Sequence, residues 1–145
     1  MGENQAPPER APNLTWIKAL CARPRQTAGM STFDHSGLMH DINEGMAILR
    51  KAQPEAMLGF TQLAKASMAE GALSTKHKEL IALAVGITQH CSGCIAYHVK
   101  ALHKLGCTRA ELDEMLAVCV YMGGGPALMY AAETLTAWEA LAPAA

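Results

Sequence analysis

From Asp34 onward, the apolar residues of this chain recur every three or four positions, a period that fits α-helices better than β-strands. Leu38, Ile42, Met46 and Leu49 show this spacing in the first such segment. No alternating run of β-branched residues accompanies it anywhere in the chain. We therefore expect an all-α fold of about six helices joined by short connections.

Local signals set the ends of the expected helices. Pro54 fits the first turn of one helix, and Gly71 is expected to end it. Ser74 or Thr75 then caps a helix that is apolar nearly all round and is therefore expected to be central. The next helix is expected to run from about residue 94 to residue 105, with a glycine directly after it.

The C-terminal part of the chain carries a further start signal and a break. Thr108 and Glu111 lie three residues apart, as in a capping box, in which each side chain accepts a hydrogen bond from the other residue's backbone. The sequence GGGP at 123–126 is expected to interrupt the following helix. A last helix is expected to carry Leu128, Leu135 and Trp138.

The composition bounds the domain organisation. A chain of 145 residues fits one domain, which we expect over 30–145, preceded by a flexible or arm-like extension over 1–29. Half of the residues are hydrophobic and only 17% are charged. A surface so short of charge favours a homo-oligomer, in which partner subunits cover apolar patches.

The charge pattern argues against two classes of partner. The net charge is −1 and no lysine or arginine cluster stands out, so we expect no nucleic acid and no anionic membrane as a partner. The longest apolar runs are too short to span a bilayer, and residues 1–29 hold no apolar run typical of a signal peptide. The five cysteines are not spaced as in a secreted disulfide scaffold, which favours a cytoplasmic protein.

The stretch HCSGCIAYH at 90–98 holds the residues most suited to chemistry. Cys91 and Cys94 are spaced so that a disulfide can close across the first turn of a helix, where the positive end of the helix dipole favours a thiolate. His98 lies four residues after Cys94 and therefore on the same helix face. An accessible thiol of low pKa beside a second cysteine is typical of peroxide or disulfide chemistry.

Glu79 lies twelve residues before Cys91, on the preceding apolar helix. A carboxylate within an apolar helix needs a partner. If the two helices pack side by side, Glu79 can face His98 and orient its imidazole or relay a proton. Charge compensation at the start of its own helix is the simpler alternative.

Other interpretations of the cysteines stay open at this point. Cys91, Cys94 and His98 can supply three ligands to zinc, with His90 or His103 as the fourth. Two further interpretations are a helical oligomer that senses redox state without turnover and thiols that serve only in packing.

Glu79, Cys91, Cys94 and His98 at this spacing resemble the signature of the alkylhydroperoxidase D-like, carboxymuconolactone decarboxylase superfamily. The resemblance extends over about 73–129 and includes HVKALHKLGCTRAEL and GGGPAL. It implies an all-α domain that assembles as trimers or hexamers. It also implies a thiol-dependent peroxidase or disulfide reductase that serves antioxidant defence and needs neither metal nor organic cofactor.

The resemblance also implies a role for each residue. Cys94 would attack a small hydroperoxide, or another thiol-reactive substrate, and Cys91 would donate a proton and close the disulfide. His98 and Glu79 would relay protons. An external dithiol, lipoyl or thioredoxin-like, would regenerate the thiols.

Two departures bear on the reaction. Alkylhydroperoxidase D tends to carry a histidine just before the second cysteine, where this chain has Gly93, although His90 stands before the first cysteine. The decarboxylase members, which offer a lyase as the alternative activity, generally lack the cysteine pair. Its presence here argues against that lyase activity.

Overall fold

The computed structural model describes residues 33–143, and within that range it shows helices and no strand. The helices are α2 (His35–Ala52), α3 (Pro54–Met68), α4 (Thr75–Thr88), α5 (Ser92–Lys104) and α6 (Arg109–Ala140). The all-α prediction is confirmed, with α6 divided by a non-helical residue at Gly124. Counting the two parts of α6 separately gives the six helices expected. The predicted extension over 1–29 lies outside the described residues.

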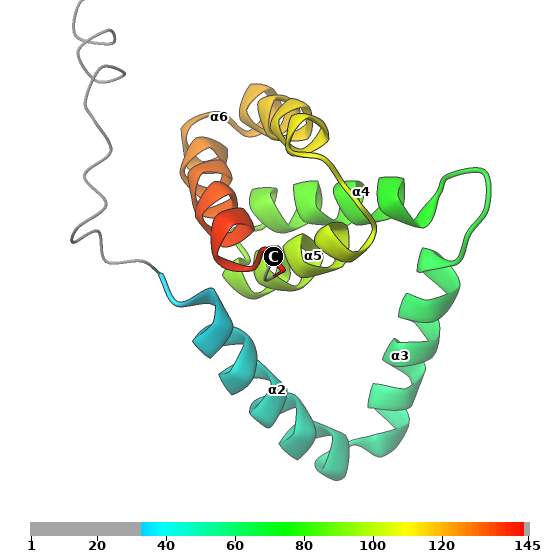
Figure 1. Ribbon diagram of the computed structural model, residues 1–145. Helices are drawn as coiled ribbons and strands as arrows, with labels where there is room; N and C mark the ends of the chain where they lie inside the picture. Colours follow the sequence, from blue (N-terminus) through cyan, green and yellow to red (C-terminus); the bar gives the residue numbers. More distant parts are fainter. Residues whose placement is uncertain (1–32, 144–145) are drawn as a thin grey trace, which may run out of the picture. The chain divides into compact units, whose positions relative to one another are not determined.

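Helices α4, α5 and α6 enclose the core of the described domain (Figure 1). Leu83 and Ile87 of α4 pack with Ile95, Val99 and Leu102 of α5, and all five are fully buried. The long helix α6 closes this core with residues from both sides of its kink: Leu112, Leu116, Cys119, Ala127, Ala131, Ala137 and Trp138.

Helix α4 packs against both α5 and α6, as expected for a central helix, but one of its apolar faces is exposed in the described domain. Ile81 and Val85 lie four residues apart on one face of α4, and their exposed fractions are 53% and 54%. Only the opposite face of the helix, with Leu83 and Ile87, meets α5 and α6. The apolar residues of α4 therefore serve two surfaces, one inside the domain and one outside it.

The predicted start signals act as expected, and one predicted stop does not. The Ser74 hydroxyl accepts a hydrogen bond from the third residue of α4, and Thr108 and Glu111 form the complete capping box. Gly106 follows α5 with a φ of 65°, in the left-handed region that glycine adopts readily. Helix α3, in contrast, ends at Met68, before it reaches Gly71.

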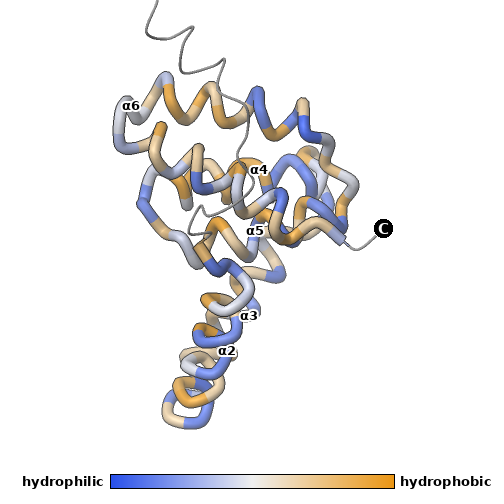
Figure 2. Tube along the Cα trace, turned by 60° about the vertical axis from the view of Figure 1, so that its left-hand side comes forward, coloured by the Kyte–Doolittle hydropathy of each residue, from blue (hydrophilic) through white to orange (hydrophobic). Residues whose placement is uncertain are grey.

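Helices α2 and α3 meet at Gln53, and their joint lies away from the core in both views (Figures 1 and 2). Helix α3 buries none of its side chains, and its large apolar residues Phe60 and Leu63 are 65% and 63% exposed. Helix α2 returns to the core at its first half, where the Tyr97 hydroxyl of α5 donates a hydrogen bond to Asn43 Oδ1 at 2.7 Å.

Helix α6 is the one helix within 33–143 that is long and apolar enough, by length and composition, to cross a membrane. Core helices of globular proteins share this property. Eight of its side chains are buried, among them Leu112 and Leu116, which belong to the core cluster. The absence of a membrane partner stays a prediction.

The capping box also joins α6 to α4 through a charge. Glu111 accepts hydrogen bonds from the Lys76 ammonium group at 2.6 Å and from the Thr108 amide at 2.8 Å. These contacts, the one to Lys76 above all, lower the pKa of Glu111 to about 2 from an ordinary value of 4.5.

We predict that the free energy of unfolding falls as the pH drops from about 4.5 toward 2, partly because Glu111 takes up a proton. A carboxyl group whose pKa is lower in the folded state stabilises the fold above its unfolded pKa and loses that contribution as the pH falls. Glu111→Gln should therefore flatten this part of the profile in urea unfolding at a series of pH values. Glu114→Gln, which alters an exposed carboxylate on the same helix, is the control. Equal slopes in wild type and Glu111→Gln would contradict the prediction.

Candidate functional site

A three-residue connection joins α4 to α5 and is held by backbone hydrogen bonds. The Cys91 amide donates to the Gly86 carbonyl at 2.9 Å, and the His90 amide donates to the Ile87 carbonyl at 3.1 Å. His90 itself has a φ of 57°. This combination is the Schellman motif, which closes a helix through one left-handed residue after its cap.

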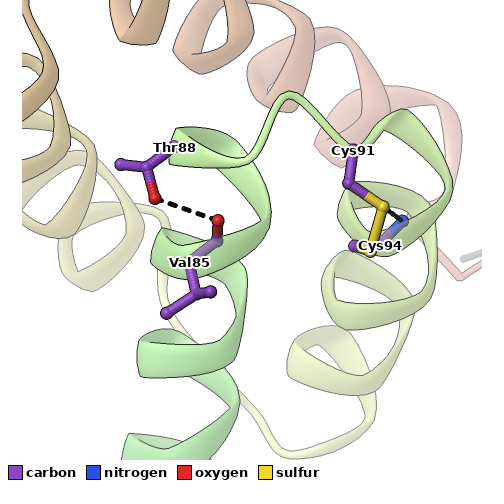
Figure 3. The surroundings of a disulfide bond; sticks show 4 residues. All are labelled: Val85, Thr88, Cys91 and Cys94. Carbon is purple, nitrogen blue, oxygen red and sulfur yellow. Dashed lines mark hydrogen bonds between the residues drawn. A yellow bond between two sulfur atoms is a disulfide. The ribbon is translucent and has the colours of Figure 1, made fainter.

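Cys91 ends that motif and at the same time begins α5. It occupies the N-cap position of α5, and its sulfur accepts a hydrogen bond from the Cys94 amide at 3.2 Å (Figure 3). An amide at a helix N-terminus stabilises negative charge on its acceptor. The Cys91 sulfur is thereby held against the first turn of α5.

The two cysteines predicted to pair are joined. Cys91 and Cys94 form a disulfide, with their Cα atoms 5.2 Å apart. Both residues are half-buried, at the edge where α5 begins. Figure 3 shows the disulfide across the first turn of α5, beside the last turn of α4.

A glycine brings α4 against this turn. A Cβ atom built on Gly86 would lie 3.0 Å from the Cys94 Cβ, which is closer than most real contacts of this kind. The backbone of α4 therefore lies directly against Cys94. Because Gly86 is buried against the backbone of Cys94 and Ile95, the position of Cys94 is set by the packing of the two helices.

Glu79 and His98 meet across the same pair of helices. The Glu79 Oε2 atom lies 2.6 Å from the His98 Nδ1 atom, and the exposed fractions of the side chains are 14% and 30%. The carboxylate bonds Nδ1 and so leaves Nε2 as the ring nitrogen free to exchange a proton. His98 lies one helical turn after Cys94. The structure thus brings together all four residues selected from the sequence.

Helix α2 covers the disulfide turn, which the sequence did not indicate. A Cβ atom on Gly93 would lie 2.7 Å from the Ile42 Cδ1 atom of α2. A side chain at position 93 would therefore displace the end of the Ile42 side chain, more so for a histidine than for an alanine. Nothing local in the sequence links Ile42 with Gly93, since they lie on separate helices.

Among the described residues, Cys107, Cys119 and His103 lie outside this arrangement. Cys107 and Cys119 are buried free thiols, and burial raises the pKa of each. The His103 ring stacks on Trp138 and donates through Nε2 to the Trp138 carbonyl at 2.9 Å. Burial of the two thiols, and the contacts of the His103 ring with Trp138, indicate that these three side chains contribute to packing.

The arrangement needed for zinc is not formed by the described residues. No group of three or more histidine, cysteine, aspartate or glutamate side chains within 33–143 is placed to hold a metal ion. The two thiols bond each other, and His98 Nδ1 bonds Glu79. What the four residues can do together is exchange protons and electrons at sulfur.

Comparison with known proteins gives a consistent picture. The carboxymuconolactone decarboxylase family model matches residues 54–137. An uncharacterized protein of Cupriavidus necator is 37% identical over 110 residues, which cover 76% of this chain and 97% of that protein. Uncharacterized protein 4 in the cox locus of Paracoccus denitrificans is also 37% identical, over 52% of this chain and 68% of its own length.

A solved structure is similar in both sequence and fold. The crystal structure of the apo form of a carboxymuconolactone decarboxylase family protein from Legionella pneumophila shares 50% identity with this chain. The match covers 75% of this chain and 97% of that one, with a TM-score of 0.74.

We predict that alanine destabilises the protein at position 86 but not at position 93. Gly86→Ala should lower the free energy of unfolding by about 1 kcal/mol, because Cys94 Cβ cannot move without its helix and the overpacking exceeds the gain in helix propensity. Gly93→Ala should be neutral or stabilising, because the end of the Ile42 side chain can rotate away. Urea unfolding of the oxidised proteins measures both changes. Equal destabilisation by the two substitutions would contradict this account.

Proposed function

Because the chain belongs to the carboxymuconolactone decarboxylase family, we propose that it uses Cys91 and Cys94 as the redox pair of a thiol-dependent peroxidase or disulfide reductase. One observation carries the proposal: the cysteine pair and the Glu79–His98 pair occupy adjacent turns at the α4–α5 contact. A thiol pair with a proton carrier one turn away is suited to reduce an O–O or S–S bond.

The proposed cycle begins with the dithiol. The Cys94 thiolate attacks one peroxide oxygen and the O–O bond breaks, so that Cys94 becomes a sulfenic acid and the departing alkoxide takes up a proton. His98, oriented by Glu79, takes up the proton of the Cys94 thiol at Nε2 as the thiolate forms and then gives it to the alkoxide. The Cys91 sulfur then attacks the Cys94 sulfur, which forms the disulfide and releases water.

An external dithiol closes the cycle. It reduces the Cys91–Cys94 disulfide by thiol–disulfide exchange and becomes oxidised itself. A lipoyl group or a thioredoxin-like protein has the required chemistry, and a reducing cytoplasm would maintain it. This cycle draws on no metal and no organic cofactor, and it would serve antioxidant defence.

We also propose that copies of this chain assemble through the exposed apolar faces. Monomeric proteins rarely expose large continuous apolar patches. Here Ile81 and Val85 on α4 are more than half exposed, and α3 buries none of its side chains. Figure 2 shows apolar segments along α3 and α6, outside the α4–α5 contact. A homotrimer or homohexamer would cover these faces by closed symmetry.

We predict that peroxide consumes the thiols of the reduced protein and that Cys94→Ser abolishes this reaction. Cys91→Ser should instead stop at a Cys94 sulfenic acid, detectable with a sulfenic-acid trap, because no second thiol remains to form the disulfide. Free-thiol titration after a peroxide pulse measures the loss. Thiol loss in Cys94→Ser at the wild-type rate would contradict the assignment of Cys94.

We predict that His98→Gln slows peroxide-dependent thiol oxidation about 100-fold, since general acid catalysis contributes at least that much. Glu79→Gln should slow the oxidation less, because this substitution only removes the group that orients the imidazole.

His103→Gln is the matched control. His103 is a histidine of the same helix bonded to Trp138, and this variant is expected to keep the wild-type rate. Steady-state peroxide consumption with a panel of dithiols then separates an enzyme from a redox sensor, which would oxidise once without turnover.

We predict that the protein is a stable oligomer in solution. Charged residues placed on the exposed face of α4 should dissociate it. Ile81→Lys combined with Val85→Glu should shift the mass toward the monomer, because neither side chain contributes to the core. Light scattering coupled to size-exclusion chromatography gives the mass of each protein. A monomeric wild-type protein at micromolar concentration would contradict the proposal.

A further inference from the structure

Two helices of this chain end in the same backbone motif but use different residues in it. After α5, Gly106 has a φ of 65°, its amide donates to His103, and the next amide, that of Cys107, donates to Leu102. After α4, His90 takes the equivalent place with a φ of 57°. The two turns therefore offer an internal comparison between a glycine and a histidine.

Glycine is the residue that this position ordinarily requires. A left-handed backbone costs a residue with a Cβ atom free energy that glycine does not lose. A Cβ atom built on Gly106 would meet no atom within 4 Å, so this position offers a side chain no contact. At the equivalent place after α4, a contact of the histidine side chain is therefore needed to offset the cost of the left-handed backbone.

The side chain of His90 has one clear partner among the described residues. Its imidazole stacks on the Tyr130 ring of α6, with ring centroids 4.7 Å apart and planes 11° from parallel. His90 is exposed and Tyr130 is half-buried, so the stack lies at the surface, next to Cys91 in the chain. It ties the α4–α5 connection to a third helix.

The stack of His90 on Tyr130 bears on the position of Cys91 more than on that of Cys94. Cys94 is held by helix packing, because Gly86 lies directly against it. Cys91 is the N-cap of α5, where its carbonyl accepts a hydrogen bond from the Ile95 amide at 3.0 Å, and its own amide donates to the Gly86 carbonyl of α4 at 2.9 Å. The bond to α4 requires the left-handed turn at His90, next to Cys91 in the chain. The separation of the two sulfurs in the dithiol state therefore depends on how firmly His90 is held.

We propose that His90 is a positioning residue for the redox pair: stacked on Tyr130, it fixes the turn that holds Cys91 within bonding distance of Cys94. This inference rests on the proposed function in that it concerns the same cysteine pair. Its consequence is thermodynamic. A firmly held Cys91 has a higher effective concentration toward Cys94, which favours the disulfide and lowers the reduction potential of the pair.

The test is the equilibrium between the protein dithiol and glutathione. Oxidation transfers two electrons: the two thiols and one glutathione disulfide become the protein disulfide and two glutathione molecules. His90→Gly keeps the left-handed turn and removes the stack. It should lower the effective concentration about threefold to tenfold, the range for an aromatic pair. This change raises the reduction potential by about 15–30 mV.

The companion variants separate positioning from stability. His90→Gly should unfold at or above the wild-type temperature, because it relieves the left-handed strain. Tyr130→Ala should raise the potential as His90→Gly does, and Tyr130→Phe, which keeps the ring, should retain the wild-type potential. The double variant His90→Gly/Tyr130→Ala should show no larger shift than either single one, because both remove the same contact.

Two results would overturn the inference. One is an unchanged potential in His90→Gly, and the other is an additive shift in the double variant. Neither result bears on peroxide turnover, because the equilibrium is measured without peroxide. Failure of the proposed function has a different signature: a wild-type protein whose dithiol oxidises with glutathione but consumes no peroxide. A wild-type protein that forms no Cys91–Cys94 disulfide in any glutathione buffer would overturn both.

Discussion

The contact between α4 and α5 at Gly86 is the constraint on which the rest of the site depends. Because position 86 has no side chain, the last turns of α4 lie against the first turn of α5 at Cys94. The same approach puts Glu79, two turns earlier on α4, within hydrogen-bonding distance of His98 on α5. A bulkier residue at this one position would separate the carboxylate from the imidazole and the thiol from both.

The helices and their starts could be predicted because their signals are local. Apolar spacing, the Ser74 cap and the Thr108–Glu111 capping box each act within one or two turns of chain. The pairing of Glu79 with His98 was also predictable, since a short connection between two helices leaves few ways to pack them. The spacing of Cys91 and Cys94 by itself allowed a disulfide, and the structure contains one.

The features that escaped prediction depend on contacts between distant segments. Position 93 lies against Ile42, some fifty residues earlier, and no local pattern connects the two. The left-handed conformation of His90 is uncommon for a residue other than glycine, and its stacking partner Tyr130 lies some forty residues later in the chain. The exposed apolar face of α4 could not be told from its buried face, because hydrophobicity alone does not say which side of a helix meets the core.

The double role of Cys91 has a consequence for how the length of this connection can vary. One residue closes the motif that ends α4 and also caps the start of α5, so no spare residue lies between the two helices. An insertion or deletion between Gln89 and Ser92 would turn α5 about its axis and carry Cys94 and His98 away from α4. The connection from Ala69 to Leu73 carries no such double role and is the place where we expect length to vary.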